Sequence, residues 1–324
     1  MLTEKAIAIC LLQILTEYSD ESHILQMREI ISKMNTLYGI SPDRRTVYSA
    51  VALLIELDYD ISTYEENGKG YYLKQRVFEP GEVHLLMDAV YSFSFLPPKH
   101  TEDLISKLQK LMSVHQRKRF KHLTIARPDV KTPNRQVFFS IEQLDTAISK
   151  KVKVEFTYLQ YDVNKKLVPR REQKYIVNPF GMVYQNDAYY LICIKEGAER
   201  VSMYRIDRMQ DIELTDCTLE PRAQGFDPNK VTKQAIYAFS GEPESVTLLC
   251  EWSVLDHVID KFGTDIRIRE KDMDKLEIRL IVSPKGVKFW ALQYLPYVEV
   301  LSPQWLRDEI MESIISNPYV QSNQ

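Results

Sequence analysis

The sequence has little cysteine and little glycine, and it lacks both a long apolar run and an excess of basic charge. Its four cysteines stand too far apart to form a Cys-x-x-Cys zinc or redox pair. Three of them lie in apolar strings, which predicts buried structural thiols in a reducing compartment. The four are Cys10, Cys193, Cys217 and Cys250. No stretch reaches about 18 uncharged apolar residues, so no transmembrane helix is predicted.

The near-balance of charge excludes a chain that is basic throughout. The 42 Lys and Arg residues face 45 Asp and Glu, a net charge of −3. Any nucleic-acid site must therefore be a local basic patch. The N-terminal segment carries Glu4 and Lys5 and has no small-residue cleavage site, which predicts an amphipathic helix rather than a signal peptide. We expect a cytoplasmic protein without membrane contact.

Sequence motifs of catalysis and cofactor binding are also missing. The chain has no Gly-x-Ser-x-Gly, His-Glu-x-x-His or Walker segment, and its six histidines are scattered without metal-ligand spacing. Gly68 and Gly70 lack the following helix that a phosphate loop needs. We therefore expect no enzyme, no metal and no cofactor.

Residues 1–78 have the pattern of a DNA-binding module. Apolar residues recur at helical spacing in three segments, and Ser41 and Pro42 are expected to start the third. The segments are 4–18, 23–38 and 41–57. Two β-prone runs then flank Asn67-Gly68, the signature of a tight hairpin turn. Three helices followed by a hairpin predict a winged helix-turn-helix, with the hairpin as the wing.

Two adjacent arginines stand at the start of the third helix, where the helix dipole favours anions. Because this helix enters the DNA major groove in such modules, we expect Arg44 and Arg45 to meet phosphates or guanine edges. Further DNA contacts are expected from Thr46, Tyr48, Ser49 and, at the wing tip, Lys69. However, residues 1–78 hold eight Lys or Arg and eleven Asp or Glu, 8 − 11 = −3. A protein-interaction module with a solvated arginine pair therefore stays open.

Residues 79–137 predict a helical linker. Its segment HQRKRFKH, residues 115–122, is the most basic stretch of the chain. The cations Arg117, Lys118, Arg119 and Lys121 suit either a solvated helix end or contacts to the DNA backbone in a dimer. Two prolines mark residues 124–137 as an irregular connection.

The rest of the chain predicts two further modules, so the fold class is α+β with several domains. Residues 138–220 read as a short helix over 141–150 followed by a small barrel or strongly bent sheet. The expected strands are 152–158, 174–184, 188–194, 201–207 and 211–219. Residues 244–318 follow the order βαββαβ, which predicts a ferredoxin-like domain.

The segment YIVNPFGMVYQNDAYYLICIKEGAERVSMYRIDRM, residues 175–209, carries a family pattern. The matching residues are Tyr175, Val177 and Pro179, then Tyr190 and Leu191, then Arg200, Tyr204, Arg205, Asp207 and Arg208. With Phe156 and Tyr158 on the preceding strand, the set resembles the WYL-domain transcriptional regulators of bacteria. Tyr189 stands where these proteins have their naming tryptophan, which keeps an aromatic plane but shrinks it.

The resemblance covers nearly the whole chain. It implies a winged helix-turn-helix, a helical linker, a small Sm-like WYL β-barrel and a C-terminal extension linked to dimer contacts. It also implies a WYL domain that senses a nucleic-acid-type or other anionic ligand.

Aromatic planes stack on bases and guanidinium groups grip phosphates, so we expect a nucleotide or single-stranded nucleic-acid effector. Its expected contacts are Tyr158, Tyr189, Tyr190, Arg200, Tyr204, Arg205 and Arg208. Strand alternation places Tyr204 inward and Arg205 on the opposite face. Arg208 is expected either at the ligand or paired with Asp207 or a neighbouring acid. Packing or ion pairing stays an alternative for each of these residues.

These observations predict a ligand-responsive, DNA-binding transcription regulator. We expect a homodimer that reads a palindromic double-stranded operator. The alternative is an accessory factor that binds nucleic acid or nucleotides and whose winged helix contacts a protein partner.

Overall fold

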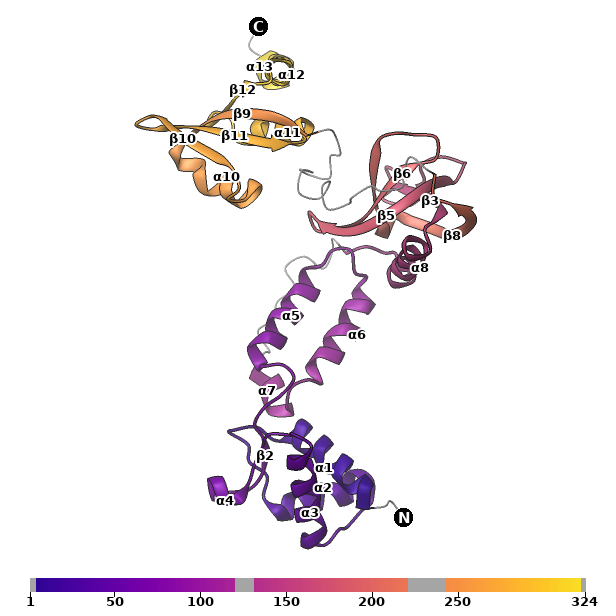
Figure 1. Cartoon of the computed structure of the whole chain (residues 1–324), viewed down its shortest axis with the longest axis vertical. Coiled ribbons are helices and arrows are strands. Elements are labelled where there is room, and N and C mark those ends of the chain that lie inside the picture. The colour runs from indigo at the N-terminus through magenta and orange to yellow at the C-terminus, as the bar shows by residue number, and fades with distance from the viewer. Residues whose placement is uncertain (1–3, 120–130, 221–242, 322–324) are drawn as a thin grey trace. The chain divides into compact units, whose positions relative to one another are not determined.

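The computed structural model describes residues 4–119, 131–220 and 243–321. The chain divides into two compact units, Met1–Arg135 and Gln136–Gln324 (Figure 1). Within the described residues, no helix has both the length and the apolar content needed to cross a membrane.

The first unit begins with three helices, as expected. They are α1 (Glu4–Tyr18), α2 (Met27–Tyr38) and α3 (Arg44–Glu56). Their apolar stripes meet in one core, in which Leu11, Met34 and Val47 are fully buried. Gly39 ends α2 in the left-handed conformation with φ 68°, a C-cap that glycine adopts without strain.

The starts of α2 and α3 differ from the prediction. Asp43, not Ser41, caps α3, because its carboxylate accepts the Thr46 amide at 2.8 Å. Helix α2 starts at Met27 rather than His23. The preceding residues are used elsewhere, since His23 pairs with Asp20 and Leu25 bridges to Tyr71.

The hairpin that we predicted as a wing is shorter than expected and has a different turn. Strands β1 (Ile61–Ser62) and β2 (Tyr72–Leu73) pair antiparallel, but the short helix α4 (Tyr64–Asn67) lies between them. The prediction of a two-residue turn at Asn67-Gly68 is therefore wrong. The Asn67 amide closes the loop instead by donating to Ser62 Oγ and the Gly70 carbonyl.

The next described part of the first unit is helical. It comprises α5 (Pro80–Ser92), α6 (Pro98–Gln109) and α7 (Val114–Arg119), packed around Val83, Met87, Ile105 and Met112. Lys121 and residues 124–130 lie outside the described residues, so the expectations for them have no structural counterpart.

The second unit opens with α8 (Val137–Lys150) and a curled antiparallel sheet. The strands are β3 (Val152–Tyr161), β4 (Leu167–Pro169), β5 (Tyr175–Gln185), β6 (Ala188–Lys195), β7 (Val201–Arg205) and β8 (Met209–Thr218), with the 3-10 turn η2 (Ile206–Arg208) before β8. Their order is β4-β3-β5-β6-β7, and β8 also pairs with β3.

Two features of this sheet differ from the prediction. Strand β4 was not expected. Among the described residues β7 pairs only with β6, so the sheet curls without the closure that a full barrel requires. The chain leaves β7 through η2 and returns along the far side of the sheet, on β3.

The chain then forms a four-stranded antiparallel sheet with three helices. Its elements are β9 (Glu244–Glu251), η4 (Trp252–Val254), α10 (Leu255–Phe262), β10 (Arg267–Asp272), β11 (Lys275–Val282), α11 (Pro284–Gln293), β12 (Val298–Ser302) and α12 (Gln304–Ile315), followed by the short α13 (Pro318–Gln321). The strand order is β10-β11-β9-β12, and the elements follow the expected βαββαβ order. Residues of α10, α11 and α12 share one apolar core with β9, β11 and β12, centred on Trp290.

Candidate nucleic-acid and effector sites

Helix α3 presents its first turn to solvent. Val47, Ala50 and Val51 face the core, which leaves Arg44, Arg45, Tyr48 and Ser49 on the exposed side. Neither arginine side chain makes a hydrogen bond or ion pair within the described residues. The hydrogen bond from the Thr46 amide lowers the pKa of the Asp43 carboxyl, so this capping side chain is charged at neutral pH. The Thr46 amide is thus used in the helix cap, whereas the guanidinium groups of Arg44 and Arg45 can bind an external anion.

Tyr48 and Lys69 extend this surface toward the wing. Tyr48 is 51% exposed, and its hydroxyl is hydrogen-bonded to Tyr71. Burial and this hydrogen bond raise the pKa of Tyr71 to about 12. Lys69 is exposed, and its amide donates to Asn67 Oδ1 at 2.7 Å. The structure therefore brings the six predicted DNA-binding residues to α3 and the adjacent wing loop.

Arg117 of α7 was expected at a solvated helix end or at the DNA backbone, but the structure gives it an internal partner. Its guanidinium makes a bidentate pair with Glu17 of α1, at 2.9 and 2.7 Å, and also donates to two carbonyls. Arg117 therefore ties the helical linker to the three-helix core. Lys118 is exposed.

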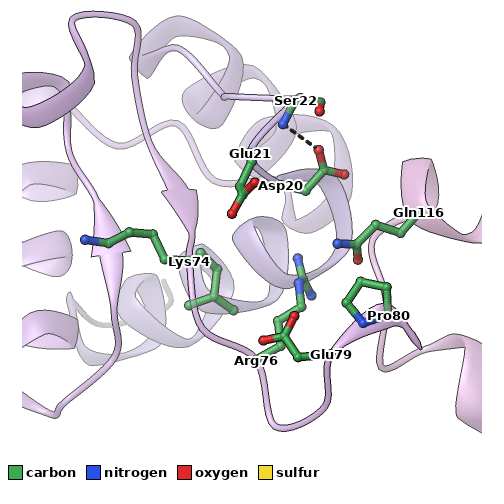
Figure 2. Close-up of a pocket in the computed structure, with 9 residues that line it drawn as sticks. Asp20, Glu21, Ser22, Lys74, Arg76, Glu79, Pro80 and Gln116 are labelled. Carbon is green, nitrogen blue, oxygen red and sulfur yellow. Dashed lines mark hydrogen bonds between the residues drawn. The ribbon is translucent and has the colours of Figure 1, made fainter. Parts of the chain in front are cut away.

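Beside this contact lies a polar pocket of about 170 Å³, lined by α1–α2 turn residues, the end of the wing and Gln116. Figure 2 shows Arg76 among acidic neighbours, with the Ser22 amide bonded to the Asp20 carboxylate. The Arg76 guanidinium donates to the carbonyls of Thr16 and Ser19. Since ligand pockets usually measure about 300 Å³ or more, this one is too small for a nucleotide.

The curled sheet of the second unit encloses an aromatic core. The rings of Tyr158 and Tyr204 lie 4.8 Å apart at 75°, and Phe156 and Tyr175 pack against both. Burial raises the pKa of both Tyr158 and Tyr204. Only 5% of Tyr204 is exposed, so its ring has no free face on which a base could stack. The expectation that Tyr158 and Tyr204 stack on a ligand is not compatible with this packing.

At the end of β7, Arg205 is held by Asp207. Its Nε and Nη2 donate to the two carboxylate oxygens at 3.0 and 2.9 Å, and its amide donates to the Tyr158 hydroxyl at 3.3 Å. The hydrogen bonds to Asp207 raise the pKa of Arg205. The sequence analysis offered Asp207 as a partner of Arg208, but in the structure Asp207 pairs with Arg205. Only Nη1 of Arg205 makes no hydrogen bond among the described residues.

Tyr189 and Tyr190 face opposite ways. Tyr190 stands directly across from Arg205 on β7, so the two side chains share a face. Tyr189 packs instead against the enclosed core. The Arg208 guanidinium lies 5.6 Å from the Tyr161 ring centre and makes no hydrogen bond or ion pair within the described residues. Arg200 is exposed in the bend before β7. Of the predicted effector residues, Tyr190, Arg200, Arg205 and Arg208 remain accessible, and Tyr189 is partly exposed although it packs against the core.

Protein-family models match the two parts of the second unit. The WYL domain model matches residues 140–214, and the WCX domain model matches residues 242–314. The chain carries a WYL domain. The resemblance seen in the sequence is thereby confirmed for these two segments, and the WYL match covers most of α8 and of the curled sheet.

Similar solved structures are distant. Proteasome accessory factor B/C (PafBC) of Arthrobacter aurescens matches with 16% identity and a TM-score of 0.28, covering 96% of this chain and 48% of that chain. The chain thus spans about half the length of that structure. The crystal structure of a CRISPR Cas-related protein matches with 10% identity and a TM-score of 0.40, over 75% of this chain and 72% of that one. Because both TM-scores lie below 0.5, neither similarity bears on function. No curated protein matches the chain at a significant level.

Sequence reasoning missed two cations beside the WYL domain's aromatic core. Arg171 lies 3.6 Å from the Tyr175 ring centre, and Lys195 lies 5.8 Å from the same ring. The signal for Lys195 was present, because alternation along β6 puts it on the face of Leu191 and Cys193. Arg171 stands in an irregular turn, where no periodicity applies. Among the described residues, no cluster of His, Cys, Asp and Glu side chains has the geometry to hold a metal.

Proposed function

We propose that this WYL-domain protein is a DNA-binding transcription regulator that responds to an anionic ligand. Its winged helix-turn-helix would read an operator, and its WYL domain would sense a nucleotide or single-stranded nucleic acid. The proposal gives the chain no catalytic role.

The observation that carries the proposal is the exposed start of α3. Two arginines whose side chains make no hydrogen bond or ion pair within the described residues stand beside a wing whose loop presents Lys69. Cations at a helix start are unfavourable unless an anion neutralises them. DNA supplies that anion when such a helix enters the major groove, since the first residues of the helix contact phosphates and base edges. Because residues 1–78 are net acidic, this contact is local and its non-specific component is weak.

For the effector, support comes from Tyr190, Arg200 and Arg208. Tyr190 offers an aromatic plane on the face of Arg205, and Arg208 and Arg200 offer guanidinium groups that make no ion pair within the described residues, although Arg200 stands at the end of β7 opposite to Arg205. Arg205 would bind the ligand through Nη1 alone, because its Nε and Nη2 already donate to Asp207. Arginine forks bind phosphate oxygens, so an anionic ligand fits this surface.

The mechanism requires two protein geometries. In a homodimer, two winged helices would contact the half-sites of a palindromic operator. A ligand at the WYL domain shifts their spacing only if it binds one dimer geometry better than the other.

Fluorescence anisotropy on DNA from the gene's own upstream region, with scrambled DNA as comparison, tests operator binding. Tight and sequence-selective binding that is lost in Arg44→Ala/Arg45→Ala supports the proposal. Equal, weak binding to both DNAs by a folded dimer contradicts it.

The effector site is tested by Arg208→Ala and Arg200→Ala. Both variants are expected to keep operator binding and lose the response to single-stranded oligonucleotides. Arg205→Ala also removes a structural ion pair, so it is the less selective probe. Loss of both activities in folded Arg208→Ala would argue against a separate sensor.

A second function is favoured by apolar side chains at the other end of α3. Leu53, Ile55 and Leu57 are 41%, 44% and 61% exposed. An accessory factor whose winged helix contacts a protein would use them. Leu53→Ser/Leu57→Ser would then abolish partner binding, whereas DNA binding would survive.

A further inference from the structure

One side chain organises the loop between β1 and β2, residues 63–71, which we call the wing loop. The Asn67 amide uses all of its hydrogen-bonding capacity there. Its Nδ2 donates to Ser62 Oγ at 2.9 Å and to the Gly70 carbonyl at 3.0 Å. Its Oδ1 accepts hydrogen bonds from the amides of Lys69 and Gly70, at 2.7 and 2.9 Å. Asn67 therefore fixes the backbone on both sides of Lys69.

The end of the wing loop is anchored to the three-helix core. Tyr71 is buried, and its backbone exchanges hydrogen bonds of 2.8 and 3.0 Å with Leu25, just before α2. Gly70 lies so close to this segment that a Cβ there would collide with the Leu25 carbonyl oxygen. The Tyr71 hydroxyl is hydrogen-bonded to Tyr48 of α3. Because Asn67 ties Lys69 to Gly70, the place of Lys69 relative to α3 is fixed as well.

The charges of the wing loop make the position of Lys69 important. Lys69 is the only cation in this loop, and its side chain makes no hydrogen bond or ion pair within the described residues. Two acids, Glu65 and Glu66, lie in the short helix α4 just before it. Glu66 pairs with Lys74 at 3.4 Å, whereas Glu65 is exposed. Without the Asn67 hydrogen bonds, Lys69 could turn toward these carboxylates and would then be lost to an external anion.

We propose that Asn67 is a positioning residue that holds Lys69 beside α3, where the lysine ammonium group contacts a phosphate of bound DNA. This inference rests on the proposed function and deepens it, because it names the side chain on which that contact depends. Asn67 itself does not contact the DNA, since its polar atoms are all used within the protein. Asn67→Ala is therefore expected to change DNA affinity only through Lys69.

The first test uses the free full-length chain and a lysine-specific endoprotease. Asn67 ends α4 without a positive φ, so alanine is compatible with its backbone. Asn67→Ala is expected to raise the rate of cleavage after Lys69 about tenfold, because it removes the hydrogen bonds that hold the loop closed. Cleavage after Lys165, in an exposed turn of the WYL domain, is the internal reference and should not change. The control Asn35→Ala removes an exposed amide from α2 and should leave both rates unchanged.

The second test is a double-mutant cycle in operator binding, measured by fluorescence anisotropy over a salt series. Lys69→Gln is expected to reduce the slope of log affinity against log salt by about 0.9, the value for one phosphate contact. Asn67→Ala should give a similar reduction, and the double variant should lose no more than either single variant. The losses from Asn67→Ala and Arg44→Ala should instead add, because the hydrogen bonds of Asn67 do not reach Arg44.

A conservative variant guards against a general loss of structure. Asn67→Asp keeps an acceptor for the Lys69 and Gly70 amides but loses both donations from Nδ2. Its cleavage rate and its salt slope are expected to lie between those of the wild type and of Asn67→Ala. The melting temperature of each variant checks that it is folded.

Three outcomes would overturn the proposal. They are an unchanged rate of cleavage after Lys69 in folded Asn67→Ala, additive losses of affinity from Asn67→Ala and Lys69→Gln, and a wild-type slope in Lys69→Gln. In each case selective operator binding by the wild type would leave the proposed function standing. If the wild type does not bind its operator, the proposed function fails and the phosphate contact of Lys69 fails with it. The cleavage rates would still decide whether Asn67 holds the loop.

Discussion

The start of α3 and the end of β7 both concentrate arginine and tyrosine, but the fold treats them differently. Arg44 and Arg45 are exposed and make no ion pair within the described residues, although the charge of Arg45 helps to lower the pKa of the neighbouring Asp43, whereas Arg205 makes a bidentate pair with the buried Asp207. Tyr48 is half exposed, whereas Tyr204 is enclosed. Similar residue types are therefore exposed in one region, where we propose that they bind DNA, and hold the fold together in the other. The distinction predicts which substitutions affect stability and which affect binding.

The largest expected effect is on the enclosed tyrosine. Tyr204→Ala removes a ring that packs against Phe156, Tyr158 and Tyr175, and should lower the free energy of unfolding by about 3–5 kcal/mol. Urea denaturation measures it. The control Tyr161→Ala, at a half-exposed ring, should cost less than about 1 kcal/mol. Equal losses in the two variants would refute the assignment of Tyr204 to the core.

The next effect concerns the partner of Arg205. Asp207→Asn leaves a guanidinium without its acid, and because 29% of the Arg205 side chain remains exposed we expect a loss of about 2 kcal/mol in unfolding free energy. Asp211→Asn is the matched control, since Asp211 is exposed and its φ of 51° suits asparagine. A difference near zero between the two would show that the pair carries no stability.

Arg117 should have a smaller effect, because its pair with Glu17 is only partly buried. Arg117→Gln is expected to lower the free energy of unfolding by about 1 kcal/mol. It should leave DNA affinity unchanged. Lys118→Gln removes the adjacent exposed charge and should leave stability unaltered. A fall in DNA affinity for Arg117→Gln at unchanged stability would instead place Arg117 at the DNA.

The smallest effect is a pH dependence at Asp20. Burial raises the pKa of this carboxyl, but its hydrogen bonds from Ser113 and with His23 outweigh burial and bring it below the ordinary value. Such a group contributes stability above about pH 3.9, and the contribution is lost as the pH falls through the folded pKa. The stability gap between wild type and Asp20→Asn should therefore narrow below about pH 4 in urea titrations. A constant gap down to pH 2 would contradict this account.

Much of the fold was predictable because its patterns are local. Helical periodicity located α1 and α3, alternation located β5, β6 and β11, and Gly39 marked the end of α2. The turn between β1 and β2 was not predictable from the Asn-Gly pair, because the Asn67 side chain makes a hydrogen bond to Ser62 across the loop. The cap of α3 depended on a competition between Ser41 and Asp43 that the backbone resolves.

The candidate sites were predicted less completely. Residue type placed Arg44 and Arg45 correctly on an exposed helix face, since the apolar stripe of α3 fixes that face. Residue type did not separate Tyr189 from Tyr190, although alternation along β6 does. The partners of Arg117 and Arg205 come from the folded chain, as Glu17 lies 100 residues from Arg117. A sequence pattern does not contain such distant pairings.

The central claim is that Arg44 and Arg45 of α3 bind DNA, whereas Arg117 is held inside the protein by its pair with Glu17. The most direct test is the salt dependence of operator affinity for Arg44→Ala/Arg45→Ala and for Arg117→Gln. The account predicts that the α3 variant reduces the slope of log affinity against log salt by about 2, at about 0.9 per lost phosphate contact, while Arg117→Gln keeps the wild-type slope. A wild-type slope in the α3 variant, or a reduced slope in Arg117→Gln, would contradict it.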